Sequence, residues 1–426
     1  MMTFVYKRHS AYSVTEGSDL VGVGAHGLSR RAILRGGLAM AAGVMAPASM
    51  DARARQGHGP GLVHPGGEGP ERITSLLSLI PREFRRQGPY WEYDDYARQF
   101  ASLGIDHDSG GPDAPESLVD DAIGSMALQY LAPIMSAGRE DFVRAMGFNP
   151  LGMHQMLITA RSAMERVTLY RGDIDPDALV AAWTGFGYEP RESASGIPLW
   201  TINPEGENVL DMSATWLWSG QLYNVAIIDD VVAFTSTLSM LEDVLDLVTN
   251  GGETILDDPL CGALAGSLPD TTVSSIVLPA AAMQDPRETS GEEFVEDAAG
   301  HLARVRDEVG PMPELQGMAF AVNEGTIAPD ADLPTDNPRE DAGLGMIRMA
   351  ASSPEDAAQA NLVVTRRFEE LDSPIFEVPY SQVFRPLPGE VSGNIASLDF
   401  RLLDRPYGWA TLVKRSDILP FVVDGA

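Results

Sequence analysis

The sequence predicts an α+β protein of two ferredoxin-like (split βαβ) units packed together, with an N-terminal helical segment. Three observations support this prediction. The 426 residues are 44% hydrophobic and only 21% charged, which is sufficient for sizeable cores. Short strand patterns alternate with helical periodicity along much of the chain. One type of helix start, a cap residue followed by proline and an acid, occurs twice after a predicted strand.

Charge and cysteine content exclude several classes of protein. The chain carries 61 acidic and 30 basic residues, a formal net charge of −31. A general nucleic-acid binder is excluded, because neutralising phosphates requires a basic surface. The single cysteine, Cys261, excludes a disulfide framework, a thiolate-held iron–sulfur cluster and a cysteine-rich zinc site.

The fold is expected to begin at residue 71. Residues 55–70 are rich in Gly, Pro and His, which predicts a flexible linker. Tyr90–Tyr93 is expected to form a short strand, and Asp94 to cap a following helix. Residues 106–116 form an acidic, Gly/Pro-rich loop, and a helical region is expected over 117–146.

The first unit is expected to span residues 71–290, including the N-terminal helical segment. Its clearest part begins with a strand over 167–170 and a helix capped by Asp175, with Pro176 in the first turn. A later hairpin is expected to turn at Asp229-Asp230. The remaining elements predicted for this unit are strands over 188–192, 197–202, 223–228, 231–235 and 273–278 and helices over 237–250 and 259–268.

The second unit is expected to span residues 291–426. Ser353 and Pro354 open its helix, which is predicted to reach about residue 371. The other elements predicted here are strands over 318–322, 345–349 and 395–402 and a terminal helix over 407–413. The shared helix starts at Asp175 and Ser353 suggest an internal duplication. The alternative is that this start is simply common among helices.

A short stretch near the N-terminus resembles a twin-arginine (Tat) export signal. Arg30 and Arg31 stand in the place of the twin arginines, Ser29 precedes them, and the apolar pair Ile33 and Leu34 follows. The apolar run 36–48 is too short to cross a bilayer core of about 30 Å, which requires roughly 20 residues. It fits the hydrophobic part of a removable signal.

The resemblance implies export by the Tat translocase, with the mature protein in the periplasm, at the cell surface or outside the cell. Cleavage is expected after Ala48 or Ala54, so residues 1–54 form the signal and no membrane span remains. The alternative is a short, buried, alanine-rich helix in a cytosolic protein. No functional family is recognised in the rest of the chain.

The acidic loop offers the most plausible metal ligands. Asp106 and Asp108 have the spacing of the first two ligands of a calcium loop, and Asp113 and Glu116 can complete a shell. Ser117 stands where the pattern needs a glutamate. A solvated acidic loop explains the same residues, and no other cofactor is expected.

Aromatic residues provide a second candidate site. Trp216 and Trp218 alternate, so in a strand they share one face, and Trp200 and Tyr223 lie nearby in the sequence. Exposed, these rings can stack on sugars or other rings. The alternative is that they belong to the core.

No catalytic motif is found in the sequence. The nucleophile elbow Gly-x-Ser-x-Gly and the zinc motif His-Glu-x-x-His are both missing. A triad using His154 or His301 remains open, because triads assemble in space. Asp257-Asp258 fits a helix start, and Cys261 a small buried hydrophobic residue.

The sequence therefore favours an exported, non-catalytic binding or interaction protein of the cell envelope or exterior, with an unknown ligand or partner. Two alternatives stay open. One is an exported hydrolase with a spatially assembled acid or Ser/His site, and the other is a secreted calcium-binding protein.

Overall fold

A computed structural model describes most of the chain beyond the linker. The described residues are 71–85, 90–102, 143–149, 152–161, 165–203, 222–269, 271–279, 292–323, 344–373, 378–402 and 419–421. The predicted signal, the linker, the loop 106–116 and the terminal helix 407–413 lie outside these ranges, as does most of the helical region 117–146.

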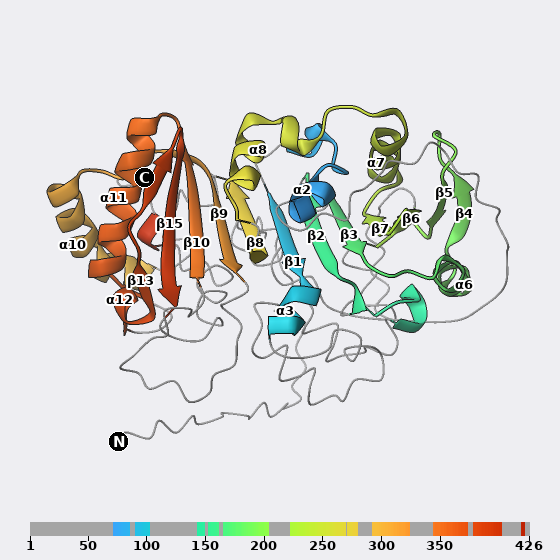
Figure 1. Ribbon diagram of the computed structural model, residues 1–426, viewed down its shortest axis with the longest axis horizontal. Helices are drawn as coiled ribbons and strands as arrows, with labels where there is room; N and C mark the ends of the chain where they lie inside the picture. Colours follow the sequence, from blue (N-terminus) through green and yellow to red (C-terminus); the bar gives the residue numbers. More distant parts are fainter. Residues whose placement is uncertain are drawn as a thin grey trace, which may run out of the picture.

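One antiparallel sheet of 13 strands forms the centre of the protein (Figure 1). The strands follow the order β13-β15-β10-β9-β8-β1-β2-β3-β7-β6-β5-β4, and β14 pairs with β15. Their bounds are β1 Trp91–Asp95, β2 Gln155–Ala160, β3 Arg166–Arg171, β4 Glu189–Glu192, β5 Pro198–Thr201, β6 Asn224–Ile228, β7 Val231–Thr235, β8 Thr272–Pro279, β9 Leu315–Asn323, β10 Leu344–Ala351, β13 Phe384–Pro386, β14 Glu390–Ser392 and β15 Ile395–Leu402. A separate pair joins β11 Asp372–Ser373 to β12 Val378–Pro379.

Helices pack on both faces of this sheet. Their bounds are α2 Glu71–Leu77, α3 Tyr96–Ser102, α6 Pro176–Phe186, α7 Leu238–Asn250, α8 Pro259–Gly266, α10 Glu292–Val309, α11 Pro354–Glu370 and α12 Tyr380–Val383, with 3₁₀ turns η1 Arg82–Arg85, η5 Ile255–Asp257 and η8 Leu419–Phe421. The α+β class is therefore confirmed. No helix of the described ranges is long and apolar enough to span a membrane.

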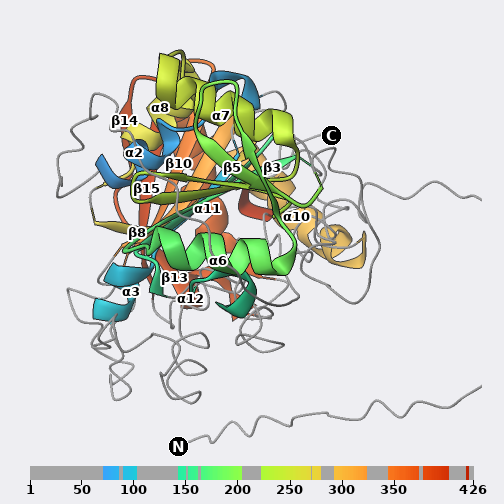
Figure 2. The ribbon, with the colours of Figure 1, turned by 90° about the vertical axis from the view of Figure 1, so that its right-hand side faces the viewer.

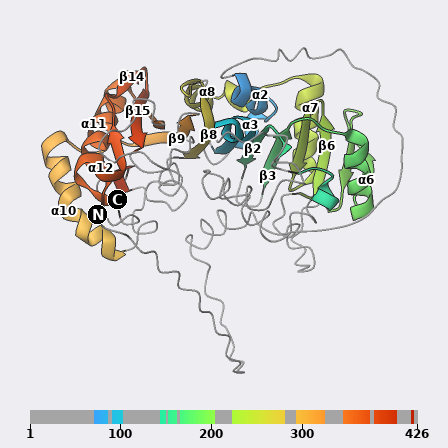
Figure 3. The same ribbon diagram turned by 60° about the horizontal axis from the view of Figure 1, so that its bottom comes forward.

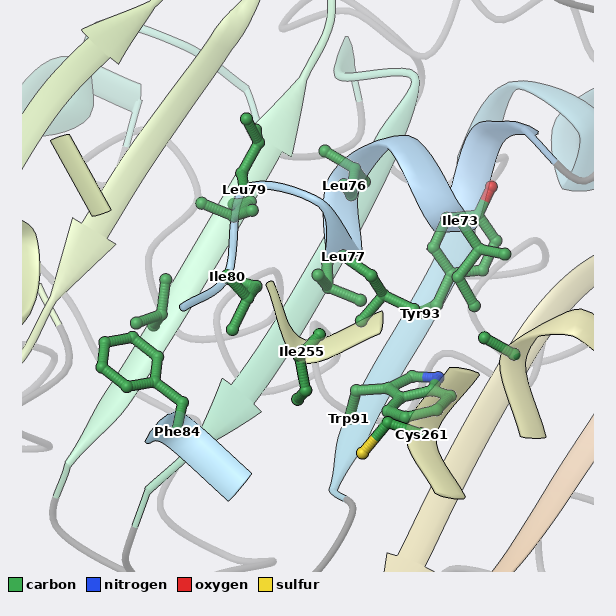
Figure 4. Close-up of a cluster of buried hydrophobic side chains, with 14 of the residues drawn as sticks. Ile73, Leu76, Leu77, Leu79, Ile80, Phe84, Trp91, Tyr93, Ile255 and Cys261 are labelled. Carbon is green, nitrogen blue, oxygen red and sulfur yellow. The ribbon is translucent and has the colours of Figure 1, made fainter. Parts of the chain in front are cut away.

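Side chains alternate across the sheet, which defines two faces. We call the face that bears Trp91 and Tyr93 the first face, and the face that bears Glu92 and Asp94 the second. Helices α2, α7 and α8 cover the first face, whereas α3 and α6 lie on the other side of the strands (Figure 2). One apolar cluster continues under these three helices from β5 to β10 and β15. Figure 4 shows the part of this cluster around α2 and β1.

The second face carries two separate apolar clusters. Helix α11 covers β9, β10 and β15, where Phe320, Phe368 and Phe400 are buried. Helix α6 covers β2, β3, β7 and β6, where Trp183 and Phe234 are buried. Helices α10 and α11 accordingly lie at one end of the sheet and α6 at the other (Figure 3). The central strand β1 lies between the two clusters.

The two halves of the chain repeat one order of elements. The first runs β1-α3-β2-β3-α6 and reaches β7 after β4–β6, and the second runs β8-α10-β9-β10-α11 and reaches β15. The halves meet where β1 pairs with β8. Beside this junction, η1 and η5 make a reciprocal contact: Arg82 N–H donates to the Glu253 carbonyl at 3.1 Å, and Ile255 N–H to the Ile80 carbonyl at 2.8 Å.

The predicted ferredoxin-like strand order is not observed among the described strands. In a split βαβ unit, the two strands joined by a helix are separated by a further strand. Here β3 and β4, which flank the predicted helix α6, are separated by β7, β6 and β5, and β10, which precedes the predicted helix α11, pairs directly with β15. Each half begins as a meander, β1-β2-β3 and β8-β9-β10, after which β3 pairs with β7 and β10 with β15. The 13 strands belong to one sheet instead of two.

Several predicted helix starts and turns agree with the structure. Asp175 caps α6 by accepting from the N–H groups of Asp177 (3.1 Å) and Ala178 (3.2 Å), and Ser353 caps α11. Asp229 takes the left-handed conformation, with φ 52°, in the hairpin turn between β6 and β7.

One predicted cap was wrong by a residue. Asp94 belongs to β1, and Asp95 accepts the N–H of Arg98 at 3.1 Å at the start of α3. The strand thus continues further than expected, and this places Asp94 on the second face beside Glu92.

Candidate functional site

Most of the predicted site residues lie outside the described ranges. These are Arg30, Arg31, Ile33 and Leu34 of the signal, the acids Asp106, Asp108, Asp113 and Glu116, and the tryptophans Trp216 and Trp218. Trp200 and Tyr223 are described, with 9% and 2% of their surface exposed. Trp200 belongs to the apolar cluster under α6, where it packs on Trp183 with ring centroids 5.4 Å apart, and Tyr223 is buried beside β6. In this structure the two rings are core residues.

Four other residues named in the sequence analysis lie close to identified partners. Asp258 caps α8 and pairs with Arg85, and Asp257 closes a capping box with Thr254. His154 faces Asp173 across 4.0 Å, and His301 Nδ1 lies 3.3 Å from the carbonyl of Glu370. The two histidines lie in different halves of the chain.

Cys261 is the buried hydrophobic residue that the sequence predicted. It has no exposed surface, and from α8 it packs in the same apolar cluster as Trp91 (Figure 4). Burial raises the pKa of this thiol to about 11, although Arg85 acts in the opposite direction. Such a thiol stays protonated at neutral pH and is a poor nucleophile.

The strongest candidate site is a buried polar group of residues between the two clusters of the second face. We call it the polar seam and define it by Tyr90, Glu92, Asp94 and Gln99. Glu92 and Asp94 are 6% and 4% exposed, and Gln99 is fully buried. Carboxylates are seldom buried to this degree, because leaving water costs them several kcal/mol unless partners compensate.

The strand places both carboxylates on one face. Glu92 and Asp94 are two residues apart in β1, so their Cα atoms are separated by about 7 Å and their side chains point the same way. Across the ladder, Glu92 lies opposite Ile158 and Ile276, and Asp94 opposite Met156 and Ser274. The acids therefore lie in largely apolar surroundings at the junction of the two halves.

Neutral groups hydrogen-bond the two acids. The Tyr90 hydroxyl donates to Glu92 Oε1, and Gln99 Nε2 donates to Asp94 Oδ1 at 3.2 Å. Gln99 Nε2 also donates to the Val273 carbonyl at 2.9 Å, which ties α3 to β8 and fixes the orientation of the amide. The Gln99 Oε1 atom is buried and accepts no hydrogen bond.

The negative charge of the seam contributes to the raised pKa values of Tyr96 and Tyr90. Burial raises the pKa of the Tyr96 phenol well above its ordinary value, and Asp94, Tyr170 and Glu92 add to the rise. Burial also raises the pKa of Tyr90, with Glu92 adding to the effect and Arg166 opposing it. Both carboxylates therefore act on the same hydroxyl of Tyr96, which donates to Met156 Sδ at 3.2 Å.

The sequence pattern of β1 predicts a strand, but it does not predict a buried polar site. Trp91-Glu92-Tyr93-Asp94 alternates aromatic and acidic residues, the pattern of a strand with one apolar and one polar face. Such a polar face normally meets solvent. Here the strand is central, and its acidic side chains are buried as well.

Chemically, the seam presents acceptors. Two carboxylates and one amide oxygen favour a ligand that carries positive charge or hydrogen-bond donors. Two carboxylates on one face can also divide acid and base roles if their surroundings separate their pKa values.

No protein-family model matches the chain, and no curated protein matches it. Among solved structures, the chain is similar to crystal form I of TP0453, with 10% identity over 79% of this chain and 96% of that one. The TM-score is 0.30, a likeness too low to bear on fold or function.

Proposed function

We propose that this protein is exported folded by the Tat translocase and acts beyond the cytoplasmic membrane as a non-catalytic binding protein. The observation that carries the binding role is the polar seam. Its Gln99 Oε1 atom is a buried acceptor that receives no hydrogen bond, which is costly in a protein that binds nothing, and a ligand can supply a donor to it. The seam lies at the junction of the two halves, where both contribute neighbouring strands.

The export part of the proposal rests on Arg30, Arg31 and the apolar run that follows them. The destination is the periplasm, the cell surface or the medium. An excess of acidic residues supports a soluble mature protein that avoids anionic lipids and nucleic acids.

Native mass spectrometry of the protein purified from a Tat-competent host tests both parts. The denatured mass is expected to correspond to a chain beginning at residue 49 or 55. A mature chain that begins at residue 1 contradicts the export proposal. A native mass above the denatured mass identifies bound cargo, and its size distinguishes a metal from an organic ligand.

A hydrolase is the second candidate, because Glu92 and Asp94 share one face of β1. Inverting glycosidases hold two carboxyl groups about 6.5–9.5 Å apart, with a water between them. This alternative predicts slow hydrolysis of nitrophenyl glycosides by the mature protein and its loss in Asp94→Asn. No turnover, together with bound cargo, supports the binding role.

We also infer that the two halves arose by duplication. The repeated order of elements, the equivalent caps Asp175 and Ser353, and the reciprocal contact of η1 with η5 support this origin. The proposed repeats are 71–235 and 238–402. The boundary expected from the sequence, between residues 290 and 291, lies between β8 and α10, inside the second repeat.

A further inference from the structure

The dipeptide Asn-Gly occurs once in the chain, at Asn250-Gly251, and the structure places it at the exposed end of a helix. Asn250 is the last residue of α7, and Gly251 follows as its cap. Both residues are exposed, and a Cβ added at Gly251 would meet nothing within 4 Å. Water therefore reaches the peptide bond between them.

An asparagine side chain can react with the backbone of the residue that follows it. The Gly251 nitrogen attacks Cγ of Asn250, the Cγ–Nδ2 bond breaks, and ammonia leaves with the proton of the Gly251 N–H. Water then opens the cyclic succinimide, giving aspartate by attack at Cγ or isoaspartate by attack at the backbone carbonyl carbon. Glycine favours ring closure, because it has no side chain to hinder the attacking nitrogen and leaves the backbone free to turn.

Two hydrogen bonds oppose this reaction while α7 is intact. The Gly251 N–H donates to the Leu247 carbonyl at 2.9 Å, and Asn250 Nδ2 donates to Asp246 Oδ1 at 2.6 Å. Both lie in the last turn of the helix, where the backbone opens most readily. Gly251 and Gly252 follow with φ values of 73° and 158°, so no rigid segment holds this turn closed.

We propose that Asn250-Gly251 is a deamidation site, where the protein acquires aspartate or isoaspartate as it ages. The alternative is an ordinary helix stop, because glycine commonly follows the last helical residue. A helix stop leaves Asn250 intact, so the two explanations differ in a product that can be measured.

Deamidation is expected to weaken the end of α7. The new carboxylate replaces the hydrogen bond to Asp246 with a pair of like charges, and it lies at the negative end of the helix dipole. Isoaspartate also adds a methylene group to the main chain shortly before Glu253, whose carbonyl accepts the Arg82 N–H. We therefore expect the modification to loosen the reciprocal contact of η1 with η5.

The test is warm incubation of the full chain at pH 8, followed by proteolysis and mass spectrometry of the peptide that contains Asn250. This peptide is expected to gain the mass of an NH₂-to-OH exchange and to separate into aspartate and isoaspartate forms by chromatography. Asn394 is the matched control, because it is also exposed and its Nδ2 donates to the Ser352 carbonyl at 3.3 Å. Its neighbour Ile395 is branched, so Asn394 should react more slowly by about tenfold or more.

Variants separate the chemistry from its effect on the fold. Asn250→Gln keeps an amide but closes its ring less readily, so its product at this position should fall below detection. Asn250→Asp supplies the aspartate form directly and should melt below fresh wild type, with the aged wild type lower still because it contains isoaspartate. Incubation in urea breaks both protecting hydrogen bonds and should speed the reaction of Asn250 by about tenfold.

Three outcomes overturn the inference: Asn250 remains intact in the folded protein, Asn250 reacts no faster than Asn394, or modified protein melts at the same temperature as fresh protein. The proposed binding role is tested independently, because α7 covers the first face and the polar seam lies on the second.

Discussion

Arg348 is the clearest case of a buried charge with a structural purpose. It is 6% exposed on the first face of β10, where its guanidinium donates to the Ser267 carbonyl (3.0 Å) and to Asp399 (2.6 Å). Ser267 ends α8, so the cation also complements the negative end of that helix. Arg348 thereby connects α8, β10 and β15.

Replacing Arg348 by methionine should destabilise the protein by about 1–3 kcal/mol, because it leaves a buried carbonyl and a half-buried carboxylate without their donor. Urea unfolding of the variant measures the loss. The exposed Arg385 of β13 is the matched control, and Arg385→Met should change stability by less than about 0.5 kcal/mol. Equal losses in the two variants contradict the assigned role.

The state of Cys261 gives a second prediction at this scale. Because burial raises its pKa to about 11, the thiol is protonated at pH 8 and shielded from reagents. Ellman's reagent should therefore leave the folded protein unmodified at pH 8, and label one thiol per chain in denaturant. Rapid labelling of the folded protein would contradict the prediction that Cys261 is protonated and shielded.

At the scale of elements, helix α6 illustrates how local sequence fixes a boundary. Asp175 satisfies two otherwise unpaired N–H groups, Pro176 occupies the first turn, and Gly187 ends the helix at φ 107°. These signals are local, so the sequence predicted where this helix begins.

Asp175→Ala should cost about 1 kcal/mol, because it removes the side chain that accepts from Asp177 and Ala178. Asp177→Ala is the natural comparison. It keeps the cap and loses only a charge in the first turn, so about 0.3–1 kcal/mol is expected at low salt. Thermal unfolding of both variants gives the comparison, and a larger cost for Asp177→Ala would contradict the capping assignment.

Long-range elements were harder to predict than local ones. The strand Gln155–Ala160 is buried on both faces and lacks alternation, so it was missed, and the pairing of β1 with β8 has no local signature. The polar seam was not predicted for the same reason. Glu92 and Asp94 form an ordinary polar strand face until the sheet places β1 at its centre.

For the whole molecule, the net charge of −31 controls the response to salt. Repulsion among surface acids opposes the compact state, and ions screen it. The melting temperature should rise with NaCl, mostly below about 0.2 M, where the Debye length falls to the spacing of surface charges. A rise confined to molar salt contradicts charge repulsion as the cause.

The central position of β1 in the sheet also determines when the newly synthesised chain can fold. Trp91 lies opposite Thr159 on one side and Val277 on the other, so the middle of the sheet cannot close until β8 has left the ribosome. Sheets built from such distant pairings fold slowly. A protein of this design gains from a route out of the cell that waits for folding, and the proposed twin-arginine pathway is such a route.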